Sequence, residues 1–285
     1  MAENLKELWR FRDLLRQLIR RELKVRYKNS VLGFAWSIVP PLLQVFVYTF
    51  FIRSVSTGTM SAGAYMLCGV IPWTFMTTAT LDASQSLLIN FPIIKKVYLP
   101  REIIPLAIVI SNLIHFILGW TVFFGVYLIV MPLIGKGGIH ASIQWLWFPV
   151  ITLVAVLFVT GVSLWSAALN VFYDDVKFII QTSFNLLLLL LPVFIPADVI
   201  RYTAFVSHHT WVFTLYMLLP PAAIMEGYRK TLLQPIPRGS YNNPHLVPLY
   251  MNWPTFIGSS LICVFIFWSG LTYFNYRKWQ FVERP

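Results

Sequence analysis

A short basic segment between two long apolar runs holds side chains suited to contact with a partner protein. Residues 90–105 read NFPIIKKVYLPREIIP, and they contain Lys95, Lys96, Arg101 and three prolines. Charged side chains are not expected in hydrocarbon, and proline interrupts a helix that would otherwise continue. We therefore expect this segment, called the coupling segment below, to leave the membrane. Its charged surface could then be contacted and displaced by another protein.

A second group of basic residues lies near the N-terminus and could bind phosphate. We call Arg20, Arg21, Lys24, Arg26 and Lys28 the basic collar. Guanidinium and ammonium groups form charge-assisted hydrogen bonds with phosphate, so the collar is a candidate site for the diphosphate headgroup of a lipid. Attraction to bulk anionic lipid and an effect on topology explain the same charges, and both interpretations stay open.

A third group combines prolines with charges inside an apolar interval. The apolar stretch 211–224 is interrupted by Pro220 and Pro221 and is followed by Glu226 and Arg229. It is too short and too broken to cross a bilayer, so it is expected to be a re-entrant or interfacial element.

Other polar residues allow two interpretations each. Asp82 in an apolar run is either a functional acid or a polar contact near a helix end. Asp174 and Asp175 form a possible carboxylate pair, but at a hinge they are expected to cap the following helix. His208 and His209 are adjacent, and adjacent side chains on a helix do not face one metal site.

The composition is that of an integral membrane protein. Of the 285 residues, 58% are hydrophobic and 12% are charged, whereas soluble domains carry about 25% charged residues. Several apolar runs are long enough for a transmembrane helix, and the short alternating segments of a membrane β-barrel are absent. The fold class is therefore all-α. Cys68 and Cys263 fall inside expected spans, where cysteine packs as a small apolar residue.

The sequence also lacks the motifs of several enzyme classes. It contains no GxxxxGK[ST] phosphate loop, GxGxxG, HExxH or CxxC motif, which argues against a nucleotide-hydrolysing or metal site in this chain. We expect a subunit without catalytic activity and without a cofactor of its own. If ATP drives transport, a partner chain must supply the ATP and magnesium site.

The elements that position these residues are one amphipathic helix and six spans. Residues 1–31 carry nine basic side chains and an apolar stripe at helical spacing, which predicts a helix lying at the membrane interface. The remaining domain, 32–285, includes the coupling segment and an external region at 197–252. The six expected spans are 33–52, 65–88, 103–131, 147–171, 178–195 and 254–274.

The distribution of positive charge predicts the orientation. With the N-terminus inside, sixteen of the 22 Lys and Arg residues lie on the cytoplasmic side and six lie outside. This agrees with the positive-inside rule for six spans with both termini cytoplasmic. Net charge is +11, which here reports topology and contact with anionic lipid; no feature favours nucleic acid as a partner.

Four stretches resemble the permease subunits of ATP-binding-cassette exporters of the polysaccharide, O-antigen and teichoic-acid branch. They are RYKNSVLGFAWSIVPPL at 26–42, INFPIIKKVYLPREIIPL at 89–106, LNVFYDDVKFIIQ at 169–181 and PPAAIMEGYRKTLL at 220–233. The resemblance covers almost the whole chain. It implies a homodimer bound to two copies of a separate ATPase subunit, exporting a lipid-linked polysaccharide across a bacterial or archaeal cytoplasmic (inner) membrane.

The resemblance also implies roles for individual residues. A coupling helix centred on 93–98 would contact the ATPase, and Pro220 to Lys230 would form part of an outer gate. An exporter of amphiphilic drugs or glycolipids, and an ATP-independent secondary transporter, are the alternative functions. The implied ATPase-coupling residues are Ile93, Ile94, Lys95, Lys96, Val97, Tyr98 and Arg101, and the implied gate residues are Pro220, Pro221, Glu226 and Arg229.

Overall fold

The structure is a computed structural model of the chain. Most of the first expected span lies outside the residues that it describes, as do Lys28, Val97 and Tyr98. The described residues are 9–26, 61–96, 99–130, 142–194, 197–201, 209–233 and 251–282, with 39, 40, 43, 46, 47 and 133 between them.

Every regular element in these described ranges is a helix. Three of them, labelled η, are short π- or 3-10 helices that extend or precede an α-helix. The elements in chain order are α2 (Arg12–Arg26), α4 (Ser61–Ile89), α5 (Phe91–Ile94), α6 (Ile103–Phe124), η2 (Gly125–Val130), η3 (Ile143–Trp147), α8 (Phe148–Phe172), α9 (Val176–Leu190), α10 (Ala197–Arg201), α12 (Thr210–Leu218), α13 (Pro220–Leu232), α14 (Trp253–Arg277) and η5 (Lys278–Val282).

Four helical stretches in the described part are long and apolar enough to cross a membrane: Ala64–Ile89, Ile103–Ile129, Ile143–Phe172 and Trp253–Phe281. They coincide with the second, third, fourth and sixth expected spans. The fifth expected span is the apolar helix α9, whose 15 residues extend about 22 Å at 1.5 Å per residue. The described structure is thus an all-helical protein with four membrane-length helices.

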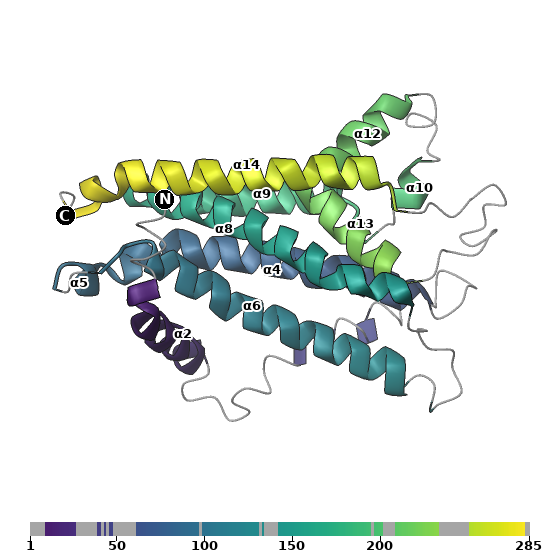
Figure 1. Ribbon diagram of the computed structural model, residues 1–285, viewed down its shortest axis with the longest axis horizontal. Helices are drawn as coiled ribbons and strands as arrows, with labels where there is room; N and C mark the ends of the chain where they lie inside the picture. Colours follow the sequence, from purple (N-terminus) through teal and green to yellow (C-terminus); the bar gives the residue numbers. More distant parts are fainter. Residues whose placement is uncertain are drawn as a thin grey trace.

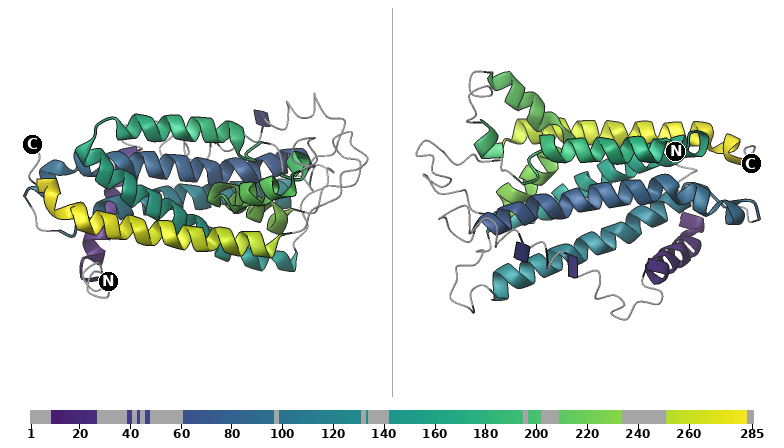
Figure 2. Two further views of the ribbon diagram at one scale, coloured as in Figure 1. Left: turned by 90° about the horizontal axis from the view of Figure 1, so that it is seen from above. Right: turned by 180° about the vertical axis from the view of Figure 1, so that it is seen from behind.

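The long helices run side by side, with α4 and α8 in the middle (Figure 1). Helix α4 packs against α6, α8, α9 and α13, while α14 packs mainly against α8. The view from above places α9 along one edge of the bundle and α14 along the other (Figure 2). The main core lies between α4, α6, α8 and α13.

Small residues allow α8 and α14 to approach closely. A Cβ atom at Gly270 would lie 2.4 Å from the carbonyl oxygen of Gly161, and one at Gly161 would lie 2.7 Å from the backbone of Phe267. Close approach of backbones at small residues is a common way of packing helices in membranes. Beside this contact, Trp165 stacks on Tyr273 with ring centroids 4.2 Å apart and donates a hydrogen bond to Ser269 at 3.1 Å.

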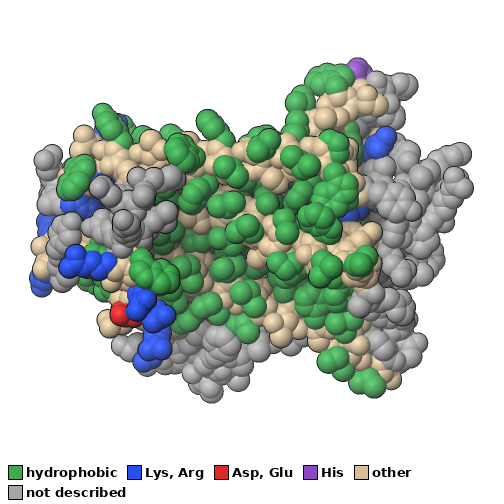
Figure 3. Space-filling view, in the orientation of Figure 1, with side chains coloured by type: hydrophobic (Ala, Val, Ile, Leu, Met, Phe, Trp, Pro, Cys, Tyr) green, Lys and Arg blue, Asp and Glu red, His purple; other side chains and the backbone are tan. Residues whose placement is uncertain are grey.

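The two ends of the bundle differ in chemistry. Helices α2 and α5 and the C-terminal η5 lie at one end, and α10, α12 and α13 lie toward the other (Figure 1). Lys and Arg side chains gather near α2 and α5, whereas hydrophobic side chains cover the flank between the ends (Figure 3). Exposed Leu261, Phe265 and Trp268 of α14 contribute to that apolar flank, as expected for a surface that meets lipid.

Helix α2 makes more contact with protein than the sequence predicted. Its apolar stripe was expected to lie in the lipid headgroup region, but Leu18 is buried and packs in one cluster with Ile94, Ile103 and Phe281. Helix α2 packs chiefly on α6. The stripe therefore serves at least in part to hold α2 on the bundle.

Candidate functional site

The coupling segment begins with a single helical turn. Helix α5 spans Phe91–Ile94, with Asn90 at its N-cap and proline in its first turn, where a missing N–H costs nothing. The amides of Ile93 and Ile94 donate to the Asn90 carbonyl at 3.0 and 3.1 Å. The sequence analysis expected a helix centred on 93–98. In the structure the helix begins two residues earlier, at Phe91, because Asn90 and the proline start it there.

The side chains of this turn divide between the core and the solvent. Ile94 is buried in the cluster that includes Leu18, whereas Lys95 and Lys96 are exposed. The ammonium group of Lys95 lies 4.6 Å from the centre of the Phe91 ring. One face of α5 is therefore anchored to the bundle while two positive charges remain open to a partner.

The far end of the coupling segment turns into α6. The amide of Ile103 donates to the Pro100 carbonyl at 3.0 Å, and Glu102 occupies the N-cap of α6. Burial lowers the pKa of the Arg101 guanidinium below its ordinary value, and the neighbouring Glu102 carboxylate opposes that shift. Glu102 accepts a hydrogen bond from Lys278 at 2.8 Å, which links this turn to the C-terminal tail.

The basic collar separates into two groups. Arg20 and Lys24 are exposed. Arg21 donates to the side-chain oxygen of Asn90 and contacts the carboxylate of Glu22 at 2.7 Å. The first pair is thus open to an external anion, while Arg21 fastens α2 to the start of α5.

Arg26 belongs to the second group and contacts the acid that stood out in the sequence. It donates to Asp82 at 2.6 Å and to Asn112 at 3.2 Å, and Asn112 in turn donates to Asp82 at 3.1 Å. Asp82 lies seven residues before Ile89, the last residue of α4, a distance of about 10 Å along the helix. Charges at this depth usually pair or face water, and Asp82 does so as part of a network between α2, α4 and α6.

A polar cavity adjoins this network. It has a volume of about 240 Å³ and is lined by residues of α2, α4 and α6, among them Glu22, Arg26, Gln85 and Ser111. Ser111 is 1% exposed, and its hydroxyl has no hydrogen-bond partner in the described part of the chain. The cavity could not be predicted from the sequence, because its walls come from three separate stretches.

At the opposite end, α13 carries a buried ion pair. The chain breaks at Leu219, and α13 begins with Pro220 and Pro221, both of which are buried. Arg229 is 0% exposed and Glu226 is 2% exposed, and their side chains meet at 2.7 Å. The sequence singled out these residues, and the structure brings them together.

The Arg229 guanidinium also satisfies backbone carbonyls from other elements. It donates to Tyr65 at the start of α4 at 2.9 Å, and to Pro192 and Val193 just after α9 at 2.5 and 2.6 Å. Glu226 accepts a hydrogen bond from the amide of Ala197 at 3.0 Å. Carbonyls freed by the end of α9 thus gain a charged donor, which is how broken helices are tolerated at membrane depth.

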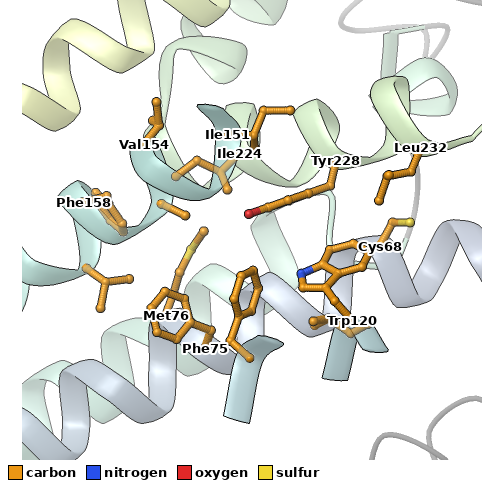
Figure 4. Packing of buried hydrophobic residues seen from close by; sticks show 14 of the residues in the cluster. Cys68, Phe75, Met76, Trp120, Ile151, Val154, Phe158, Ile224, Tyr228 and Leu232 are labelled. Atoms are coloured by element: carbon orange, nitrogen blue, oxygen red, sulfur yellow. The ribbon is translucent and has the colours of Figure 1, made fainter. Parts of the chain in front are cut away.

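Aromatic packing fixes α13 against the core. The ring centroids of Trp120 and Tyr228 are 4.8 Å apart, and the Tyr228 hydroxyl hydrogen-bonds with Thr152 at 2.9 Å. Figure 4 shows Tyr228 projecting from α13 into the space bordered by Ile151 of α8 and Trp120 of α6. Helix α13 is therefore an integral part of the main core.

The hinge before α9 differs from expectation. Asp175 is at the N-cap, but its side chain makes no capping hydrogen bond. The side-chain oxygen of Asn170 instead accepts from the amide of Lys177 at 3.2 Å. Asp174 and Asp175 are both exposed, so their predicted capping role is wrong, although their charge still lies favourably at the positive end of α9.

The four helices long and apolar enough to cross a membrane are those of a multi-pass helical membrane protein. The chain matches the ABC-2 type transporter family over residues 13–233, and it belongs to that family. The family confirms the resemblance to ATP-binding-cassette permeases, and membership implies an ATP-binding-cassette ATPase as a partner.

O-antigen export permeases from two bacteria match nearly the full length of the chain. The O-antigen export system permease protein RfbA of Klebsiella pneumoniae is 29% identical over 273 residues, which cover 95% of this chain and 94% of that protein. The RfbA permease of Myxococcus xanthus is 26% identical over 289 residues, which cover 99% of both chains.

Proposed function

We propose that this chain is the permease subunit of an exporter for lipid-linked polysaccharide of the O-antigen, capsule or teichoic-acid type. Two copies form the path across the cytoplasmic membrane, and two copies of a separate ATP-binding-cassette ATPase drive transport. Family membership supports the ATPase partner, and the names of the relatives from Klebsiella and Myxococcus support the substrate class. The chain carries no catalytic residue of its own in this scheme.

The topology in this proposal has six spans and two cytoplasmic termini. Residues 33–52 and the α9 region complete the four membrane-length helices. The Lys and Arg side chains that gather near α2 and α5 (Figure 3) support a cytoplasmic position for this end, in keeping with the positive-inside rule. The coupling segment then meets the ATPase in the cytoplasm, and α13 with Pro220, Pro221, Glu226 and Arg229 belongs to the outer gate.

The observation that carries the proposal is a pair of exposed polar stripes on helices at membrane depth. On α4, Thr74 and Thr78 are exposed, and Asp82 and Gln85 are half-exposed; their spacing of three or four residues places them on one face. The threonine hydroxyls bond to carbonyls of their own helix. Asp82 is paired with Arg26, and Gln85 lines the cavity that α4 shares with α2 and α6, so this stripe already borders a polar space.

The second stripe lies on α9. Gln181 and Asn185 are exposed and four residues apart, so they share one face of an apolar helix. Helix α9 lies at one edge of the bundle, beside α4 (Figure 2), so its exposed amide stripe suits a watery path for a hydrophilic polymer between two copies of the chain. Sequence reasoning did not identify this stripe, although the four-residue spacing of Gln181 and Asn185 was a signal for it.

Replacement of the two amides tests the path. Gln181→Leu together with Asn185→Leu keeps similar side-chain volume and removes the hydrogen-bonding groups, so surface polysaccharide should fall several-fold while membrane insertion and dimer content stay normal. Leu186→Met is the matched control, because Leu186 is 59% exposed and lies about 100° around the helix from Asn185. Normal export in the double variant would remove α9 from the path.

Copurification tests the assignment as a whole. The tagged chain should bring down an ATP-binding-cassette ATPase in about equal amount, and deletion of that ATPase should stop export. If no such ATPase copurifies and polysaccharide still reaches the surface without one, the chain does not work as proposed.

A further inference from the structure

Both ends of the coupling segment are held by basic residues that are remote in the sequence. At the start, Arg21 of α2 donates to the side chain of Asn90, 69 positions away. At the end, Lys278 of the tail contacts Glu102 at 2.8 Å, 176 positions away. The segment is therefore not a loop supported by α4 and α6 alone.

The contact at Glu102 is shielded from solvent. The exposed fractions of the Lys278 and Glu102 side chains are 18% and 5%. Glu102 directly precedes α6, and its second carboxylate oxygen has no hydrogen-bond partner among the described residues. Loss of Lys278 would leave a buried carboxylate without its principal partner, which is costly in a water-poor site.

Phe281 is a buried aromatic residue of the same tail, close to this ion pair. It is 1% exposed, and its ring lies 5.4 Å from Phe274 and 5.8 Å from Phe172. The Arg101 guanidinium lies 6.0 Å from the centre of the Phe281 ring. The same apolar cluster contains Ile94 of α5, so the tail packs into the core on which the coupling turn rests.

The contacts of the coupling segment determine which helices move when a partner protein displaces it. Displacement of α5 acts directly on Asn90 at its N-cap. Through Ile94 it also acts on the apolar cluster that holds Ile103, next to Glu102, and Phe281 of the tail. The tail η5 continues from α14 without a break. A force applied at Glu102 is therefore transmitted through Lys278 to α14, a membrane-length helix that is far from α5 in the sequence. Without that contact, the turn can deform locally, and the displacement of α5 is not transmitted to α14.

We propose that the C-terminal tail, through Lys278 and Phe281, braces the coupling segment and passes motion of α5 to α14. Lys278 and Phe281 are positioning residues, since they act through Glu102 and the turn at Arg101. The proposal rests on the proposed function, because it assumes that an ATPase acts on α5.

The test uses the full chain expressed with its ATPase and measures copurification, ATP hydrolysis and polysaccharide export. Lys278→Gln should leave the ATPase bound but lower export per ATP hydrolysed about fivefold or more, within the range set by coupling between contacting residues. Lys278→Arg should keep at least half of the export. Phe281→Ala should resemble Lys278→Gln.

The matched control is Gln280→Glu, which changes the charge of the same tail by one unit at an exposed position. Its coupling should equal that of the wild-type chain. The exchange of both partners, Glu102→Lys with Lys278→Glu, should restore export relative to Lys278→Glu alone. Restoration supports a direct link between the two side chains, which a general loss of stability does not predict.

Two results separate the brace from the proposed function. If the wild-type chain binds no ATPase, the proposed function fails. If the ATPase binds and drives export, but Lys278→Gln and Phe281→Ala export per ATP as the wild type does, the brace alone is overturned. Equal loss in Lys278→Gln and Gln280→Glu also overturns it, because tail charge would then be responsible.

Discussion

The guanidinium of Arg229 occupies the space that a side chain at Gly69 would need. A Cβ atom at Gly69 would lie 2.4 Å from Arg229 Nη2 and 2.3 Å from the carbonyl oxygen of Val193. Arg229 donates to that same carbonyl at 2.6 Å. The glycine of α4 thus makes room for the contact that ties α13 to the end of α9.

Gly69→Ala should destabilise the outer half of the bundle. Alanine is better than glycine in a helix by about 0.5 to 1 kcal/mol, but overpacking costs about 1 to 3 kcal/mol when neighbours cannot yield. One neighbour is backbone and the other is a fully buried side chain, so the steric cost should win. A lower Tm of the purified chain and reduced export would show this.

The control for this change is another buried glycine of the same bundle. Gly119→Ala places its Cβ 3.5 Å from the nearest Ile71 atom, which is ordinary contact, so stability should change little or rise. If Gly69→Ala is as stable as Gly119→Ala, the Arg229 contact is looser than described.

Arg229→Lys should fail although it keeps the positive charge. A lysine offers one compact ammonium, whereas Arg229 reaches the carbonyls of Tyr65, Pro192 and Val193 as well as Glu226. An ammonium has three donors for these four acceptors, so at least one acceptor would lose its donor, at about 1 to 3 kcal/mol for each buried unsatisfied group. Thermal unfolding should show a marked decrease in Tm.

Arg201→Lys serves as the comparison, because Arg201 is exposed and lies over the Phe213 ring at 5.6 Å. Its replacement should change Tm by little. A similar Tm for both lysine variants would mean that the positive charge at position 229 is enough to hold α13 on the bundle, and that the planar guanidinium with its several donors is not required.

Sequence reasoning located the long helices and the charged segments, because hydropathy and proline act locally. It could not find contacts that join distant stretches, such as Lys278 to Glu102 or Arg26 to Asp82. Those contacts depend on how the helices are rotated and stacked. The predicted capping by Asp175 was wrong for a related reason: Asn170, at the end of α8, was placed to bond the first turn of α9 instead.

The collar residues should differ in their contribution to binding a diphosphate. Arg20, Lys24 and Arg26 are all exposed, but Arg26 already contacts Asp82 and Asn112. Arg20→Gln with Lys24→Gln should therefore weaken binding of farnesyl diphosphate to the purified chain about 30-fold, at about 1 kcal/mol for each charge near an anionic group. Titration calorimetry at two salt concentrations measures this.

Arg26→Gln is expected to affect the diphosphate less and the seating of α2 more. The bulk-lipid interpretation of the collar predicts a different result: phosphatidylglycerol retention would fall as much as diphosphate binding in the double variant. If Arg26→Gln weakens diphosphate binding as strongly as the double variant does, Arg26 exchanges Asp82 for the ligand, and the division of the collar is wrong.

Charge reversal at the exposed end of α5 should uncouple the ATPase. Lys95 and Lys96 are exposed while Ile94 anchors the turn in the core, so Lys95→Glu with Lys96→Glu alters the docking surface and leaves the buried Ile94 in place, at the loss of the contact of Lys95 with the Phe91 ring. We expect at least tenfold weaker ATPase association or export, with normal insertion, because like charges across an interface cost several kcal/mol. Copurification at increasing salt gives the measurement. Lys177→Glu, a single reversal in the first turn of α9, is the control and should keep most of the ATPase bound. Full binding and export by the double variant would place the contact with the ATPase elsewhere on the cytoplasmic end, and the neighbouring Arg101 would be the next residue to test.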